Sequence, residues 1–298
     1  MAETLRQLVE AELGQPVDPR VTEMAEAIAA KHGTASRAVL FYGSCLREQQ
    51  LDGLMLDFYL IVSDYAAAYD KGWLAKANAL IPPNVFPFQH GALASKYAVL
   101  SEDHFRRECS VAARTASVFA RFSQPSRLVW AADQTAREMA FDAVSQAAPA
   151  LLELTRPSMT DDEARDPLDI WRKAFAFTYG AELRAERNSR PGAIVDADPE
   201  RYRRFAIAAD FPRDIGTTDQ QRRMAEAAWR GFQRRGKRAS VLRLAKASAT
   251  YAGGAEYIAW KINRHAGTDI KLSEWQKRHP LLAAISLLPK LLRSGAIR

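Results

Sequence analysis

The sequence has little cysteine and no long apolar run. Two cysteines, Cys45 and Cys109, occur among 298 residues, which excludes a disulfide scaffold and suits a reducing compartment. No stretch approaches the ~20 apolar residues that a helix needs to cross a bilayer. The composition of 48% apolar and 26% charged residues also excludes wholesale disorder. We therefore expect a soluble globular chain with room for one large core or two domains.

The first residues resemble no targeting segment. They lack the apolar core of a signal peptide, and they are too acidic for a transit peptide. Together with the many Ala and Arg residues, this predicts a protein of the bacterial cytoplasm.

Charge is distributed unevenly along the chain. Residues 222–298 contain 17 Lys and Arg against 4 Asp and Glu, whereas residues 1–221 contain 25 against 31. A basic final quarter on an acidic body indicates that one end meets a polyanion, such as nucleic acid, anionic lipid or nucleotide phosphates. A solvated basic helix surface would give the same composition.

The first part of the sequence mixes strands with helices. Residues 37–42 and 56–62 are short, continuous apolar runs typical of buried strands, and 85–88 and 97–100 are two further candidates. Helices are expected at 4–13, 20–32 and 66–80, and another begins after Ser101, which has the properties of an N-cap.

Beyond about residue 130 the sequence predicts helices alone. They are expected at 134–154, from the capping box Thr160-x-x-Glu163 towards residue 187, and at 199–208, 219–235 and 239–264. Residues 277–298 combine an apolar stripe with Lys and Arg, which suits an interfacial helix on an anionic bilayer. An ordinary helix packed on the domain is the alternative.

One local pattern carries chemistry. A strand ends in Gly43-Ser44, and Asp57 stands near the start of the next strand. Nucleotidyltransferases of the polymerase-β type are built this way: the Gly-Ser turn holds a triphosphate, and a carboxylate holds Mg²⁺. The second carboxylate of the usual Asp-x-Asp doublet is missing, because Met55 precedes Asp57 by two residues. Asp52 on the loop could replace it, or could belong to an Asp-Gly turn.

Further stretches follow in a fixed order along the chain: Tyr42-Gly43-Ser44, Asp57-Phe58, 96–101, Ala120-Arg121-Phe122, 179–184, Glu186, Arg190, Ile194-Val195, Ser240-Val241-Leu242, Lys246, Thr250 and 257–261. This order resembles one family, the mitochondrial-type (translocator-maintenance) phosphatidate cytidylyltransferases, which also has bacterial members. The resemblance covers about residues 38–264, with Gln124 where the family has Lys and Glu182 where it has Asp.

This resemblance implies a fold, a reaction and a set of site residues. The fold would be a nucleotidyltransferase domain (1–135), a mostly helical, winged-helix-like domain (136–264) and a basic membrane-associating segment (265–298). The enzyme would transfer CMP from CTP to phosphatidic acid with Mg²⁺, peripherally on the inner face of the cell membrane and without stable nucleic-acid binding. The expected roles are Mg²⁺ binding by Asp57 and Asp52, charge neutralisation by Lys96, and phosphate binding by Gly43, Ser44, Arg121, Arg184 and Arg190.

Two other functions remain open at this point. A polymerase-β-like enzyme could add nucleotides to RNA or to a small molecule, with the basic quarter following a phosphate backbone. A non-catalytic member could have lost its metal site, as Met55 suggests, and bind membrane or nucleic acid. The carboxylates near Asp57 in the folded protein discriminate between these functions.

Overall fold

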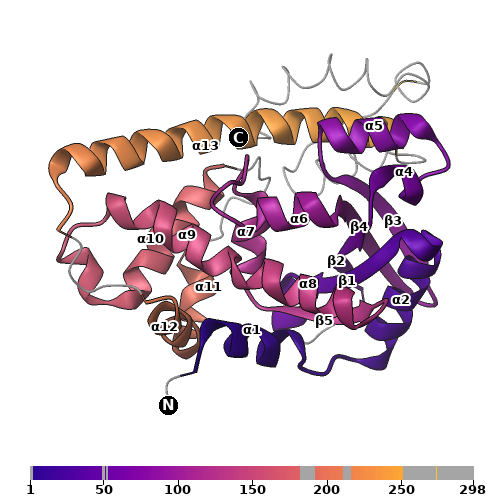
Figure 1. Ribbon diagram of the computed structural model, residues 1–298, viewed down its shortest axis with the longest axis horizontal. Helices are drawn as coiled ribbons and strands as arrows, with labels where there is room; N and C mark the ends of the chain where they lie inside the picture. The colour runs from indigo at the N-terminus through magenta and orange to yellow at the C-terminus, as the bar shows by residue number, and fades with distance from the viewer. Residues whose placement is uncertain are drawn as a thin grey trace.

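The fold combines one mixed sheet with helices on both faces and a group of helices beyond the sheet (Figure 1). The computed structural model describes residues 3–48, 51, 53–181, 192–210, 216–250 and 273. In this part of the chain the strands all lie before residue 132, and helices alone follow, which confirms the expected mixed α/β class. The proposed domain boundaries stay predictions.

The sheet has five strands in the order β3-β4-β2-β1-β5. β2 and β4 run parallel, and the other neighbours are antiparallel. Four strands are those expected from the sequence; β1 and β2 are one residue longer than expected, and β3 and β4 are three and five residues longer. The sequence does not predict the fifth, because several side chains of its six residues, SRLVWA, are only half-buried. The bounds are β1 (Ser36–Tyr42), β2 (Met55–Val62), β3 (Asn84–His90), β4 (Leu93–Ser101) and β5 (Ser126–Ala131).

Alternating side chains of the strands enter two separate cores. On β1, Ala38 and Leu40 face the first core, whereas Val39 and Phe41 face the second. The first face is covered by α1 (Leu5–Leu13), α6 (Glu102–Glu108), α7 (Ser117–Phe122) and α8 (Gln134–Ser145). The second is covered by α2 (Pro19–Ala30), α4 (Tyr65–Ala68) and α5 (Gly72–Leu80).

The first core continues without a break into the helical part of the chain. Trp171 and Tyr202 are fully buried there, and the Trp171 indole donates a hydrogen bond to the Tyr202 carbonyl at 2.9 Å. This part consists of α9 (Ala147–Thr155), α10 (Pro167–Tyr179), α11 (Ala193–Asp196), α12 (Pro199–Ala208) and α13 (Asp219–Thr250). The capping box of Thr160 and Glu163 forms, but it begins a 3₁₀ turn at Glu163–Arg165 rather than a long helix.

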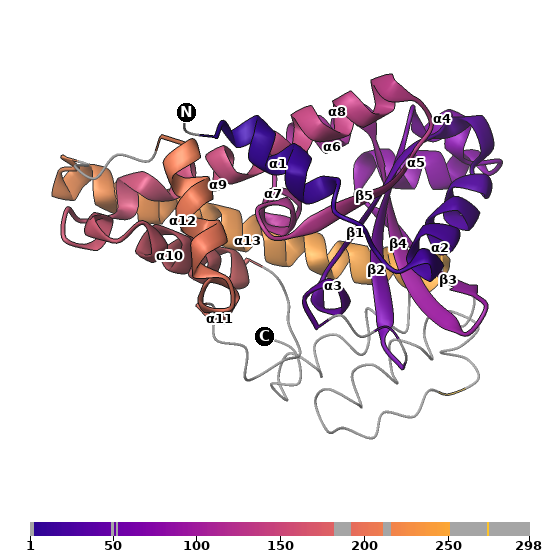
Figure 2. The ribbon, with the colours of Figure 1, turned by 90° about the horizontal axis from the view of Figure 1, so that it is seen from below.

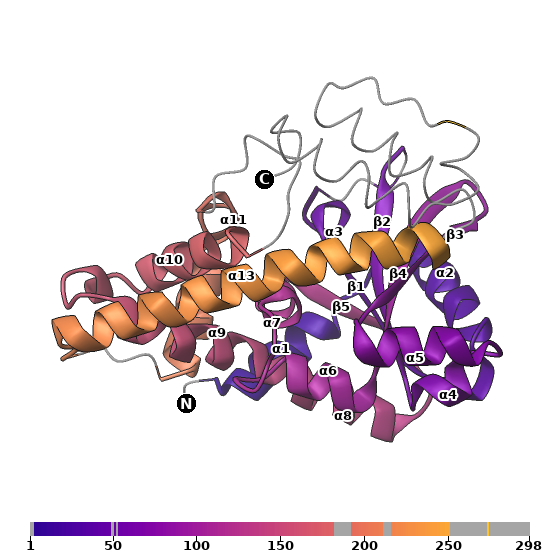
Figure 3. The same cartoon turned by 90° about the horizontal axis from the view of Figure 1, so that it is seen from above.

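The helix α13 joins the two parts of the molecule. It runs from beside α10 to the sheet edge at β3 (Figures 2 and 3). The sequence predicts two helices, 219–235 and 239–264, with a break near Gly236; the described part is instead one continuous helix through that residue. Gly236 is needed for packing: a Cβ there would lie 2.3 Å from the Ala181 carbonyl oxygen. Among the described residues, no helix is long and apolar enough to span a bilayer.

A buried lysine fixes the C-terminal half of α13 to the sheet. Lys246 is 9% exposed, and its ammonium donates hydrogen bonds to the carbonyls of Ile81 and Pro83, the latter at 2.9 Å. These carbonyls lie in the connection that leads from α5 into β3. Burial, and then the charge of Arg243, lower the pKa of Lys246 to about 7.

This shifted pKa makes the stability of the protein depend on pH. Between pH 7 and 10.5 the unfolded chain keeps the proton that folded Lys246 has lost, so raising the pH favours the folded state. We expect the free energy of unfolding of the wild type, measured in urea, to rise across this window relative to Lys246→Met. Below about pH 7, the difference in the free energy of unfolding between the wild type and Lys246→Met should not change with pH. A difference that is constant from pH 7 to 10.5 would contradict the shift.

Candidate functional site

The ends of β1 and β2 bring Gly43 against the carboxylate of Asp57. In the antiparallel register Tyr42 pairs with Asp57, so Gly43 is the first residue beyond the pairing. Gly43 has a φ of +103°, which L side chains rarely adopt, and a Cβ there would lie 3.1 Å from Asp57 Oδ2. The position therefore needs glycine for both its backbone conformation and the space beside it.

Lys96 lies beside the same carboxylate. β4 pairs in parallel with β2 so that Lys96 is opposite Asp57, and its Nζ is 2.9 Å from Asp57 Oδ1. This contact is an ion pair, and Oδ1 is buried beneath it. The negative charge of Asp57 is therefore compensated by Lys96.

Arg121 adds a second positive charge on this face of the sheet. It lies on α7, where its Nη1 donates to the Ser117 carbonyl at 3.1 Å, and its guanidinium is 5.7 Å from the centre of the Tyr42 ring. Burial and then the charge of Asp57 raise the pKa of the Tyr42 hydroxyl well above its usual range, so the phenol stays protonated. The sequence analysis assigns no role to Tyr42. The signal that could have indicated a role is the position of Tyr42 opposite Asp57 in the antiparallel pair of β1 and β2.

The Gly-Ser turn leads into a short helix, as expected. Ser44 is exposed and begins α3 (Ser44–Glu48). The next residue, Cys45, is buried, in agreement with its interpretation as a small core residue. Tyr42, Ser44, Asp57, Lys96 and Arg121 thus come together from three strands and two helices around one end of the sheet.

Other expected site residues lie outside the described residues. These are Asp52, Arg184 and Arg190, together with residues 265–298 apart from Ser273. Among the described residues, no three His, Cys, Asp or Glu side chains gather as metal ligands would.

The chemistry of this carboxylate fits Mg²⁺. Mg²⁺ prefers hard oxygen ligands and commonly takes one or two protein carboxylates, with water and substrate phosphates completing its shell. Asp57 offers one such carboxylate, half-buried at the end of the sheet and paired with Lys96. Lys96 and Arg121 suit the phosphate groups that would share the ion.

A surface pocket lies behind the turn, away from the carboxylate. It has a volume of 660 Å³, and its lining includes Val21, Phe41, Cys45 and Arg127 but not Asp57, Lys96 or Arg121. Phe41 and Cys45 belong to the second core, whereas Tyr59, two residues from Asp57 on the same strand face, belongs to the first. The site predicted from the sequence is therefore separate from this pocket.

The comparisons with known proteins do not identify a family. No protein-family model matches the chain, and no curated protein matches it. One similar solved structure is a nucleotidyltransferase-like protein from Exiguobacterium sibiricum. It shares 9% identity over 92% of each chain, with a TM-score of 0.29.

The close contact at Gly43 predicts a measurable coupling. Gly43→Ala should lower the free energy of unfolding by about 1–3 kcal/mol, because the new methyl group meets both an unfavourable φ and the Asp57 carboxylate. In an Asp57→Ala background the cost should be smaller, because the carboxylate contact is gone. Urea denaturation of the four proteins of this cycle measures the coupling.

Gly91 provides a matched control for the backbone term. It also has a positive φ, +56°, but nothing lies within 4 Å of the position that a Cβ would occupy there. Gly91→Ala should cost the same in the wild type and in Asp57→Ala. Strict additivity between Gly43→Ala and Asp57→Ala would show that the two residues do not touch.

Proposed function

We propose that this protein is a Mg²⁺-dependent nucleotidyltransferase, with its centre at Asp57. The observation that carries the proposal is the Asp57 carboxylate, which lies against the glycine turn at Gly43 and is paired with Lys96 at 2.9 Å. A carboxylate at such a turn, with basic side chains on the same face of the sheet, suits a divalent ion that carries phosphate groups. Asp57 would hold Mg²⁺, which when bound neutralises charge on the transferring phosphate.

The neighbouring residues have separate tasks in this proposal. Lys96 would orient the carboxylate and share its positive charge with an incoming phosphate, since its Nζ is already 2.9 Å from Oδ1. Arg121, fixed by the Ser117 carbonyl and the Tyr42 ring, would pair with phosphate oxygens. Ser44 is exposed at the start of α3, where the first backbone amides have no partner within the helix.

The finer proposal is that CTP is the donor and phosphatidic acid the acceptor. It rests on the order of the sequence stretches from Tyr42 to Lys246, on the basic segment 265–298, and on the exposed basic residues of α13. Those exposed on α13 are Arg230, Arg234, Arg235, Lys237 and Arg238, whereas Lys246 is buried. Exposed positive charge favours contact with an anionic membrane surface, on which a lipid substrate would be presented.

The test is pyrophosphate release from CTP and Mg²⁺, with and without phosphatidic acid in mixed micelles. The wild type should release pyrophosphate only when both substrates are present. Asp57→Asn should reduce the rate at least about 100-fold, because a neutral amide cannot hold the metal or its charge. The melting temperature should stay nearly unchanged.

A matched control shows whether the rate falls when any carboxylate is removed, or only when Asp57 is removed. Asp103→Asn removes a carboxylate whose side chain is 93% exposed, and it should leave the rate unchanged. Release that needs CTP but not phosphatidic acid would move the acceptor to RNA or a small molecule. No release by a well-folded sample, or a large fall in melting temperature for Asp57→Asn, would contradict the proposal and favour a binding or structural role.

A further inference from the structure

The surface pocket behind the Gly-Ser turn has the size and the walls of a small-molecule site. Its volume of 660 Å³ lies within the range of about 300–1,000 Å³ that is usual for ligand pockets. The connection between α1 and α2, the start of α2, β1, β5, and α3 with the residues beyond it contribute to the lining. Its apolar wall is formed by Val17, Val21, Phe41, Leu46 and Leu51.

The charged side chains of the lining leave one positive charge over. Arg20 is paired with Asp18, whose Oδ2 lies 2.8 Å from Arg20 Nη2. Arg127 on β5 donates from Nη1 to the Ser126 carbonyl at 2.8 Å and from Nη2 to the side-chain oxygen of Gln15. Both acceptors are neutral. Within the part of the chain that the structure describes, no carboxylate forms an ion pair with Arg127.

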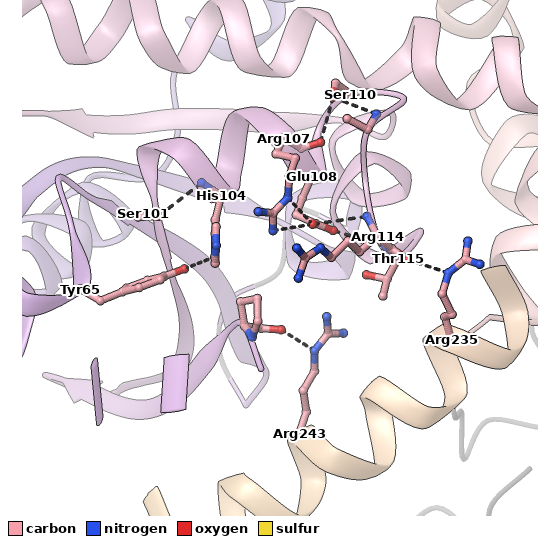
Figure 4. A network of polar contacts seen from close by, with 12 residues as sticks. Tyr65, Ser101, His104, Arg107, Glu108, Ser110, Arg114, Thr115, Arg235 and Arg243 are labelled. Carbon is pink, nitrogen blue, oxygen red and sulfur yellow. Dashed lines mark hydrogen bonds and ion pairs between the residues drawn. The ribbon is translucent and has the colours of Figure 1, made fainter. Parts of the chain in front are cut away.

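Two other arginines of limited exposure do have a carboxylate partner. Arg201 is paired with Glu12, and Arg107 Nη2 lies 3.0 Å from the carboxylate of the buried Glu108 (Figure 4). Arg127 is half-buried, and burial is the largest effect on its pKa, which it lowers; the attraction of Glu12 and the repulsion of Arg201 follow. Because removing a charge from water is costly unless an opposite charge compensates it, an anion beside Arg127 would be favourable.

The strand pairing places this arginine on the same face as the apolar wall. In the antiparallel pair of β1 and β5, Arg127 is opposite Phe41, whose side chain belongs to the second core. Side chains of directly opposite residues lie on the same face of a sheet. The pocket therefore combines an uncompensated cation with apolar surface, a combination that suits a ligand with an anionic head and an apolar body.

We propose that this pocket binds a small amphipathic monocarboxylate, whose carboxylate pairs with Arg127 and whose apolar body lies against Val17, Phe41 and Leu46. Each Nη nitrogen of a guanidinium carries two N–H groups, so Nη1 and Nη2 each keep one donor for the two carboxylate oxygens. The single negative charge of a carboxylate also balances the single positive charge of the lining, which a phosphate dianion would exceed.

The pocket adjoins the candidate site but lies on the other face of the sheet. Cys45 and Leu46 line it from α3, the helix that begins at Ser44. Asp57 lies on the first face, whereas the pocket adjoins the second core. Binding here needs neither the metal nor the nucleotide, so this site goes beyond the proposed nucleotidyl transfer.

The direct test is isothermal titration of the full chain with decanoate, below the concentration at which it forms micelles, and with decan-1-ol as its uncharged counterpart. The wild type should bind decanoate about tenfold more tightly than decanol, because the carboxylate forms charge-assisted hydrogen bonds with Arg127. In Arg127→Met this difference should disappear, while decanol binds as it does to the wild type. Absence of decanoate binding, or equal affinity of the wild type for both ligands, would overturn the proposal.

The apolar wall is tested separately by Val17→Trp. Val17 is half-buried between α1 and α2, and a larger side chain there would occupy part of the pocket. Binding of both ligands should weaken several-fold, with the melting temperature unchanged. For the wild type, each CH₂ group added between octanoate and decanoate should tighten binding about fourfold. Unchanged binding by Val17→Trp, or affinity that does not depend on chain length, would contradict a ligand in this pocket.

Arg137→Met is the matched control for charge. Arg137 is exposed on α8, which covers the opposite face of the sheet, so this variant should bind decanoate like the wild type. Equal weakening by Arg137→Met and Arg127→Met would show attraction by overall charge and overturn the site. Asp57→Asn should also bind decanoate with wild-type affinity, whatever its activity. Loss of decanoate binding in Asp57→Asn would place the carboxylate at the candidate nucleotide site and overturn a separate pocket.

Discussion

The contact between Gly43 and the Asp57 carboxylate is the constraint on which the candidate site depends. The antiparallel register of β1 and β2 places residue 42 opposite residue 57, so the chain must turn away directly beside a charged group. With a φ of +103° and a Cβ position 3.1 Å from Oδ2, Gly43 leaves room for the half-buried carboxylate at the sheet end. Lys96 from the parallel neighbour then compensates the charge. Three strands are needed to form this arrangement, and no short segment of the sequence contains it.

The helix α13 depends on a comparable close approach. The backbone of α13 at Gly236 packs against the carbonyl of Ala181. Glycine within a helical pattern usually indicates a break, but here it permits this contact and the helix continues. The continuous helix can then reach β3, where Lys246 donates to carbonyls of the preceding connection. Arg235 and Arg243 are carried to the α6–α7 connection by the same packing. The basic residues of the final part of the sequence thereby reach the first face of the sheet.

Much of the fold can be predicted from local sequence patterns, whereas the candidate site can be predicted from them only in part. Strands β1 and β2 are visible in the sequence because they are continuous apolar runs with buried neighbours on both faces. Strand β5 is not, because it lies at the sheet edge and its side chains are only partly buried. Gly43, Ser44 and Asp57 form a recognisable pattern, but the pairing of Asp57 with Lys96 depends on a parallel register across a crossover. The role of Tyr42, and the hydrogen bond of Arg243 to Ser117, arise from tertiary packing.

Charge balance connects these features. At the sheet end one carboxylate is opposed by Lys96, with Arg121 nearby; around the α6–α7 connection one carboxylate is opposed by Arg107, with Arg114, Arg235 and Arg243 nearby. Gathering like charges opposes folding, so each carboxylate offsets part of the cost of the basic side chains around it. Under the proposed function, the phosphate groups of a nucleotide would supply further negative charge beside Lys96 and Arg121. A ligand that binds the folded state alone would then stabilise the protein.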